Sequence, residues 1–262
     1  MLWHVMGSIP LFQELEKEIS GMNYVYLLVN LFTIFIPLLF SFHPRIRFDK
    51  EWKYFFPSVL IVALVFITWD VFFTRMGVWS FNPEYITGIY FFNIPIEEVM
   101  FFICIPYACV FTFYCLDRFY KLGWKAPTEK AFALMFALWL LLLGVVFRDR
   151  WYTMTSFVST AFICLFLVFI AKVSWFGKAV TVYTLLLFPF FIVNGILTGT
   201  GLEQPVVMYN NEENLGVRLL TIPLEDSVYG FELFLLNLFF FILIREKWMS
   251  PAIAGEVPVP AR

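Results

Sequence analysis

The chain has 262 residues, of which 61% are apolar and only 15% are charged. An average globular protein is about 45–50% apolar and about 25% charged. The composition therefore excludes an ordinary soluble domain and indicates an integral membrane protein. A net charge of −2 gives no reason to expect a nucleic-acid partner. The four cysteines lie in apolar stretches without a Cys-x-x-Cys pair, so we expect them to be small packing residues.

Seven apolar stretches approach the length of about 20 residues that a helix needs to cross a bilayer. The predicted fold is therefore an all-α, polytopic membrane protein with about seven transmembrane helices. We expect no cleaved signal peptide in the polar segment 1–22, and we expect the tail 247–262 to be disordered, clearly so from Ser250. The helices are predicted at residues 23–42, 54–74, 95–116, 131–147, 152–171, 179–198 and 223–244.

The basic residues predict how the chain is oriented in the cell membrane. Of the 18 Lys and Arg residues, 13 fall in alternate connections that lie on the same side as the C-terminus. Because cytoplasmic loops are enriched in Lys and Arg, we expect the C-terminus in the cytoplasm and the N-terminus outside.

One acidic motif occurs twice, each time at the start of a predicted helix. The sequence Ile-Pro-Ile-Glu-Glu ends in Glu97 and Glu98, and Ile-Pro-Leu-Glu-Asp ends in Glu225 and Asp226. Pro95 and Pro223 suit the first turn of a helix, where no amide hydrogen is needed, and the helix dipole favours carboxylates there. Acidic residues at a helix start are ordinary. Two copies of an acidic pair embedded in apolar sequence are unusual, because buried carboxyl groups are costly in a membrane. They predict a catalytic role for these four carboxyl groups.

The similarity between the two copies extends beyond the motif. At a constant offset of 128 residues, Asn82, Glu84, Gly88, Ile94 and Pro95 recur as Asn210, Glu212, Gly216, Ile222 and Pro223. The sequence thus predicts two three-helix repeats, 23–118 and 151–246, joined by a linker helix within 119–150. An odd number of spans between the copies makes them parallel, and repeat-built membrane proteins often hold their site between the repeats.

Carboxyl groups dominate the ionisable residues of the predicted helices. Asp70 and Glu232 join the four motif residues, and no Lys, Arg or His lies mid-helix to neutralise them. Burial and a neighbouring carboxylate both favour the protonated form. A buried acid beside an ionised partner is suited to general acid–base chemistry. This pattern favours protonation and deprotonation of an alkene. The sequence contains no dinucleotide fingerprint, phosphate-binding loop or Asp-rich magnesium motif, so we expect no cofactor and no metal.

Several further residues are candidates for a supporting or binding role. Asp70 and its counterpart Asn194 could orient the carboxyl groups or only bridge helices. Glu232, seven residues after Glu225, could relay a proton or bond to a neighbouring helix. Aromatic faces could stabilise a carbocation, although an interfacial aromatic belt would give the same sequence pattern. The candidate binding residues are Trp69, Trp79, Tyr90 and Tyr229, with Phe81 and Tyr209 nearby.

These motifs resemble those of the membrane-type carotenoid (lycopene) cyclases, over about residues 23–246. The resemblance rests on both Pro-x-Glu-(Glu/Asp) motifs and on Thr68-Trp69-Asp70, Gly77-Val78-Trp79 and Asn194-Gly195-Ile196-Leu197-Thr198. It implies a fused form of a two-subunit enzyme that cyclises the ends of lycopene, taken from the bilayer, to β-rings without a cofactor. Other carotenoid-biosynthesis enzymes are candidate partners. In this picture Glu97 or Glu225 donates the proton, with Glu98 or Asp226 as partner or base.

Three alternatives remain open from the sequence. A cyclase of longer, prenylated carotenoids would carry the same motifs. A proton-coupled transporter also uses repeats and membrane carboxyl groups, although here they cluster toward one face of the membrane. A pigment-binding protein without activity is the third alternative.

Overall fold

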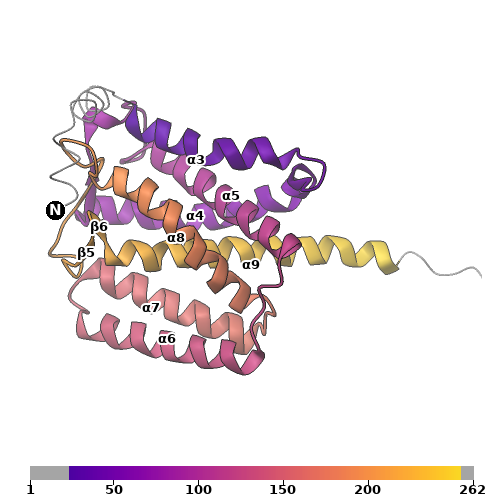
Figure 1. The fold of residues 1–262 in the computed structure, drawn as a ribbon. Helices are drawn as coiled ribbons and strands as arrows, with labels where there is room; N and C mark the ends of the chain where they lie inside the picture. The colour runs from indigo at the N-terminus through magenta and orange to yellow at the C-terminus, as the bar shows by residue number, and fades with distance from the viewer. Residues whose placement is uncertain (1–23, 255–262) are drawn as a thin grey trace, which may run out of the picture.

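The computed structural model describes residues 24–254 as a bundle of long helices running roughly side by side (Figure 1). Within this part, six helices are long and apolar enough to cross a membrane, and α3 is shorter. The predicted all-α polytopic membrane fold is confirmed, and every helix begins within about five residues of the expected position. The helices are α3 (Val25–Ser41), α4 (Trp52–Met76), α5 (Ile96–Phe119), α6 (Ala126–Val146), α7 (Trp151–Leu165), α8 (Phe176–Leu197) and α9 (Leu224–Ala254).

The ends of the described chain differ from the sequence prediction. Helix α3 has 17 residues, which gives it a length of about 25 Å, slightly short of the ~30 Å hydrocarbon core. Helix α9 continues to Ala254, so residues 247–254 are helical where disorder was expected. Extending a helix that is already nucleated costs little per residue. The polar segment 1–22 lies outside the described residues.

The outer surface of the bundle is apolar and its interior is rich in aromatic rings. Phe32, Leu64 and Phe188 expose 70% or more of their surface, which is the pattern expected of side chains that face lipid tails. Inside, Phe48 is fully buried and packs its ring against those of Phe55 and other residues of the core. Phe48 lies in a short helical turn, η1 (Phe48–Glu51), that leads into α4.

Short strands gather at one end of the bundle (Figure 1). They form two hairpins that lead into α5 and α9, and one ribbon that joins segments far apart in the chain. The hairpins pair β2 (Tyr90–Phe91) with β3 (Ile94–Pro95), and β5 (Arg218–Leu219) with β6 (Ile222–Pro223). The ribbon pairs β1 (Trp79–Phe81) with β4 (Val207–Tyr209) in antiparallel register. Turns η2 (Pro83–Tyr85) and η3 (Phe166–Ile170) complete the elements.

The β1–β4 ribbon is bordered by a reciprocal pair of backbone hydrogen bonds. The amide of Asn82 donates to the carbonyl of Val206 at 2.8 Å, and the amide of Asn210 donates to the carbonyl of Val78 at 2.9 Å. Donors and acceptors of these two bonds are each 128 residues apart, the offset seen in the sequence. The domain boundaries of the predicted repeat stay a prediction, but the ribbon itself is locally two-fold symmetric.

Helix packing brings six helix ends together beside this ribbon. Helix α3 packs along α5, α4 along α9, and α7 between α6 and α9. At the end where the strands lie, α3, α5, α7 and α9 begin while α4 and α8 end (Figure 1). Side chains from the first turns of four helices and the last turns of two others can therefore meet there.

Candidate active site

Each acidic motif lies where a hairpin turns into a helix. Pro95 and Pro223 end strands β3 and β6, one residue before α5 and α9 begin, rather than sitting inside the first helical turn as expected. A proline there fixes the backbone and leaves no amide hydrogen unpaired. The two acidic residues of each motif then occupy the second and third positions of the helix, where their charge is favoured by the helix dipole.

The first acidic residue of each motif turns away from the cavity and holds the preceding hairpin. Glu97 Oε1 accepts the amide of Thr87 at 2.7 Å, and Glu225 Oε1 accepts the amide of Leu215 at the same distance. Thr153 Oγ1 also donates to Glu225 at 2.5 Å. Both glutamates are fully buried, and neither lines the cavity described next. The predicted role of Glu97 or Glu225 as the proton donor stays a prediction, and the structure places both side chains outside the lining of that cavity.

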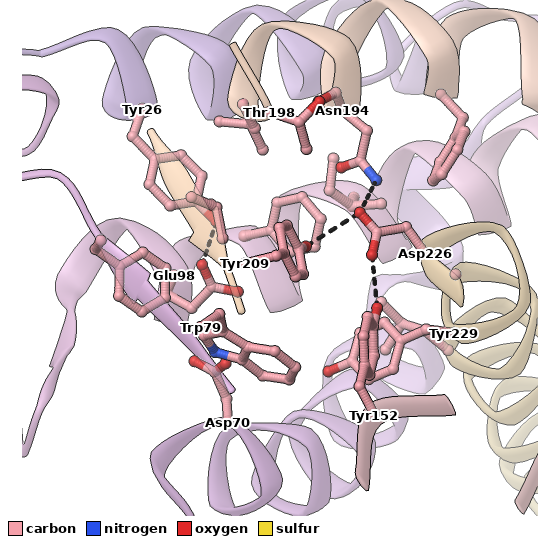
Figure 2. A pocket seen from close by; sticks show the side chains of 18 residues that line it. Tyr26, Asp70, Trp79, Glu98, Tyr152, Asn194, Thr198, Tyr209, Asp226 and Tyr229 are labelled. Atoms are coloured by element: carbon pink, nitrogen blue, oxygen red, sulfur yellow. Dashed lines mark hydrogen bonds between the residues drawn. The ribbon is translucent and has the colours of Figure 1, made fainter. Parts of the chain in front are cut away.

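The second acidic residue of each motif, Glu98 or Asp226, faces a cavity between the helix ends (Figure 2). Consecutive residues of an α-helix point about 100° apart, so one doublet cannot direct both carboxyl groups into the same space. The cavity comprises about 670 Å³ of space, part of it open to the surroundings, and also takes side chains from α3, α4, α7 and α8. Its polar and aromatic lining includes Tyr26, Asp70, Trp79, Glu98, Tyr152, Asn194, Thr198, Tyr209, Asp226 and Tyr229.

Asp226 accepts more side-chain hydrogen bonds than Asp70 or Glu98, the other acidic residues of the cavity. Tyr152 donates to Oδ1 at 2.6 Å, while Tyr209 and Asn194 donate to Oδ2 at 3.0 and 3.3 Å (Figure 2). Burial raises the pKa of the Tyr209 hydroxyl well above its ordinary value, so it keeps the proton that it donates. The predicted supporting role of Asn194 thus corresponds to a direct contact with one motif carboxyl.

Asp70 and Glu98 form the other acidic group of the cavity. Glu98 accepts a hydrogen bond from Tyr26, and Asp70 lies beside the indole nitrogen of Trp79 (Figure 2). Asp70 is buried, its Oδ2 has no hydrogen-bond partner among the described residues, and it lines the same cavity as Glu98. Two carboxylates in one buried space repel one another when both are charged.

Within the part of the chain that the structure describes, no Lys, Arg or His side chain lines this cavity. The guanidinium of Arg218 lies near its wall, with Cζ 5.8 Å from the ring centre of Tyr209. Arg218 itself donates to the Thr221 carbonyl and to Asn211 Oδ1, both at 2.8 Å. Among the described residues, no three His, Cys, Asp or Glu side chains are grouped to hold a metal ion.

The predicted aromatic residues divide into two that line the cavity and two that do not. Trp79 and Tyr229 line it. Trp69 lies behind them, with its ring centre 5.3 Å from that of Tyr229. Tyr90 lies on strand β2, is 51% exposed and does not line the cavity. Its predicted binding role stays a prediction.

Glu232 bridges two helices instead of lining the cavity. Ser159 and Thr160 of α7 donate to its Oε2 at 2.6 and 2.9 Å. Of the two roles considered for this residue, the structure shows the bond to a neighbouring helix. The contact fixes α9, and with it Asp226, against α7.

Sequence reasoning missed the two tyrosines that each bond a cavity carboxyl from a distant helix. Tyr26 and Tyr152 lie 72 and 74 residues before their partners. A signal was present, because Tyr26 and Tyr152 are the second residues of α3 and α7, 126 positions apart. Extending the comparison of the two halves to these helices would have paired them. Tyr209 was noted only as an aromatic ring, not as a donor.

Fold and site define a polytopic membrane protein with a carboxyl-rich, aromatic cavity near one end of its helix bundle. The family model described as lycopene cyclase matches residues 23–116 and 149–244. The chain therefore belongs to the lycopene cyclase family.

Two fungal relatives are similar to parts of this chain, and both are named bifunctional lycopene cyclase/phytoene synthase. The protein of Colletotrichum graminicola is 32% identical over 101 residues, which cover 37% of this chain and 17% of the relative. That of Aspergillus niger is 34% identical over 58 residues, covering 22% and 10%. The chain thus matches less than a fifth of either relative's length. No solved structure matches it significantly.

Proposed function

We propose that this protein is a carotenoid cyclase that converts the acyclic ends of lycopene into β-rings by acid–base chemistry alone. The observation that carries the proposal is the meeting of Asp70, Glu98 and Asp226 in one buried, aromatic cavity, to whose wall the described part of the chain contributes no cationic residue. Family membership supports the choice of a polyene as substrate. The apolar exterior supports delivery of that substrate from the bilayer.

The hydrogen bonds suggest how the acid and base roles divide. Three donors stabilise the ionised form of Asp226, because hydrogen bonds to a carboxylate favour that form. Asp70 and Glu98 have fewer donors and repel one another when both are charged. In this proposal the Asp70–Glu98 pair holds one proton and is the acid, and Asp226 is the base.

The reaction moves protons without any change in oxidation state. The acid pair gives its proton to the terminal double bond, which leaves a tertiary carbocation. The next suitably placed double bond of the chain attacks this cation and closes a six-membered ring, moving the positive charge onto a ring carbon. Asp226 removes a proton from the adjacent carbon, and the ring double bond forms. One proton is gained and one is lost, so the product is an isomer of the substrate.

The cavity wall can stabilise the cation without trapping it. The rings of Trp79 and Tyr229 line the space, and an aromatic face attracts a cation by about 0.5–2 kcal/mol. The hydroxyls of Tyr152 and Tyr209 donate to Asp226, so these hydrogen bonds fix the positions of both phenol rings. A general acid and base contribute about 10²–10⁴-fold each to the rate.

Expression in a bacterium that accumulates lycopene tests the proposal directly. We expect chromatography of the pigments to show β-carotene, with γ-carotene as the singly cyclised intermediate, and only lycopene with an empty vector. The purified protein in liposomes should give the same products without added flavin or nicotinamide nucleotide. Unchanged lycopene in membranes that contain the folded protein would refute the proposal. A requirement for added nucleotide would refute the cofactor-free mechanism.

A further inference from the structure

A second, apolar cleft lies next to the acidic cavity and extends along the bundle between α5 and α8. It comprises about 530 Å³ of space, part of it open to the surroundings. Helix α3 contributes Thr33 to its wall and α9 contributes Gly230. The remaining lining residues are Phe101, Ile105, Ala108, Cys109, Tyr183, Leu186, Pro189, Phe190, Val193 and Asn194.

The cleft and the acidic cavity adjoin one another and share five lining residues. Phe101, Ile105, Phe190, Asn194 and Gly230 line both spaces. Gly230 marks a narrow point of the junction, since a Cβ atom there would lie 2.9 Å from Tyr183 Oη and 3.5 Å from Phe190 Cε2. Any larger side chain at this position would fill the space between α8 and α9.

The cleft is suited to hydrocarbon along its whole length. On α8 it runs from Asn194 to Tyr183, eleven residues or about 16 Å at 1.5 Å per residue. Its hydroxyl-bearing side chains bond to backbone within the protein: Thr33 donates to the Val29 carbonyl and Tyr183 to the Ser227 carbonyl, both at 2.7 Å. The hydroxyl groups of Thr33 and Tyr183 therefore do not need water as a hydrogen-bond acceptor.

The cleft also opens toward the lipid-facing surface. Many of its lining residues are themselves partly exposed. Phe188 and Ile192, on the same helix, expose 76% and 54% of their surface. Helix α8 contains Pro189 at the edge of the cleft, and a proline inside a helix bends it and removes one backbone hydrogen bond.

We propose that this cleft is the gap through which the polyene enters from the bilayer, and that it holds the unreacted part of the chain while one end reaches Glu98 and Asp226. The inference rests on the proposed function. A linear polyene with two acyclic ends is much longer than the acidic cavity, so most of its length has to lie outside it. The adjoining apolar cleft, whose lining residues are partly exposed, offers space for that part of the chain.

Filling the cleft provides the test. Ala108→Phe adds a ring to its wall, and Gly230→Val closes the junction independently. Ala131→Phe makes the same alanine-to-phenylalanine change on α6, where Ala131 is exposed and outside both spaces. Each change is made in the active protein and in the Asp226→Asn background, where lycopene should bind without turnover. Lycopene bound per purified protein and products per cell are measured, with thermal unfolding as the check on folding.

We expect the Asp226→Asn protein to retain lycopene through purification, and Ala108→Phe to lower the retained amount at least fivefold and cyclisation at least tenfold. Gly230→Val should do the same, and Ala131→Phe should change neither. Folded Ala108→Phe and Gly230→Val proteins that bind and cyclise lycopene like the control would overturn the inference, as would an Asp226→Asn protein that retains none. If the active protein makes no rings while Ala108→Phe still displaces lycopene, the cleft stands and the proposed function fails.

Discussion

Each of the two motif carboxyl groups in the cavity is held by a tyrosine from the start of another helix. Tyr26 bonds Glu98, and Tyr152 bonds Asp226 (Figure 2). The contacts are formed between helices that are distant in the chain, so the position of each carboxyl depends on helix packing. Asp226 has two further donors and Glu98 has Asp70 as an acidic neighbour. The same kind of tyrosine–carboxyl contact thus occurs in two chemically different surroundings, one at Glu98 and one at Asp226.

The acid–base roles predict that the two glutamates of the first motif respond differently to the same change. Glu98→Gln and Asp226→Asn should each lower cyclisation at least 100-fold, because a general acid or base contributes about 10²–10⁴-fold. Glu97→Gln should lower it less than tenfold per folded molecule, since Glu97 only holds the Thr87 amide. Its effect should instead be a loss of about 1.5–3 kcal/mol in stability. The ratio of cyclised pigment to lycopene, normalised to folded protein, measures these effects. A fully active Glu98→Gln variant would contradict the proposed acid role of Glu98.

The source of the added proton is open to an isotope test. A carboxylic acid exchanges its proton with solvent between turnovers, so the proton delivered to the alkene should come from water. In deuterated medium, with unlabelled lycopene supplied in liposomes, we expect one deuterium per ring formed and two in β-carotene. Mass spectrometry of the separated pigments measures this. Products without deuterium would show that the transferred hydrogen comes from within the substrate.

At the scale of the elements, the two hairpins are built alike. Each carries a glycine with positive φ, Gly88 at 78° and Gly216 at 70°. Each turns at a bulky residue in the same conformation, Phe92 at 54° and Leu220 at 61°. Each is tied to the first acidic residue of its own motif. The hairpins therefore set the point at which α5 and α9 begin and so the direction in which Glu98 and Asp226 point.

Backbone conformation at the hairpin glycines should matter for stability. No atom lies within 4 Å of a Cβ built on Gly88 or Gly216, so replacement by alanine adds backbone strain but no clash. Gly88→Ala and Gly216→Ala should each destabilise the protein by about 1–2 kcal/mol, the cost of a left-handed residue with a side chain.

Gly123→Ala is the matched control, because its Cβ would meet only Lys178 Cε at 3.8 Å and its φ is not positive. We expect its stability to change by no more than about 0.5 kcal/mol. Thermal unfolding in detergent compares the three variants. Equal melting temperatures for all of them would show that the left-handed conformation is not required.

The sequence was sufficient for the helices but not for the direction of their side chains. Long apolar stretches specify membrane helices, and the doubled motif located the start of α5 and α9. Which residue of each doublet faces the cavity depends on how the helix is rotated, and a residue type does not reveal this. For this reason the sequence could not distinguish Glu98, which lines the cavity, from Glu97, which does not. It also gave no sign that a short strand carries Tyr90.

For the molecule as a whole, the charges predict an orientation that the fold leaves open. In the described residues, twelve Lys and Arg lie at the bundle end opposite the strands and four lie at the strand end. We expect green fluorescent protein fused to the C-terminus to fluoresce, because it requires the cytoplasm to fold. Alkaline phosphatase inserted within 202–204 should be active, because it requires the oxidising exterior. The reverse pattern would place the carboxyl cavity near the cytoplasmic leaflet.

The β1–β4 ribbon joins the two halves of the chain and brings Trp79 opposite Tyr209 in the wall of the cavity. Cutting the chain in the connection 120–125 would leave each fragment with one lone strand and an incomplete wall. We expect neither fragment alone to be active, and we expect co-expressed fragments to associate and regain cyclisation. Pigment analysis together with co-purification through a tag on one fragment measures this complementation. The gene could then be divided between two promoters, and the dosage of either fragment would set the yield of rings.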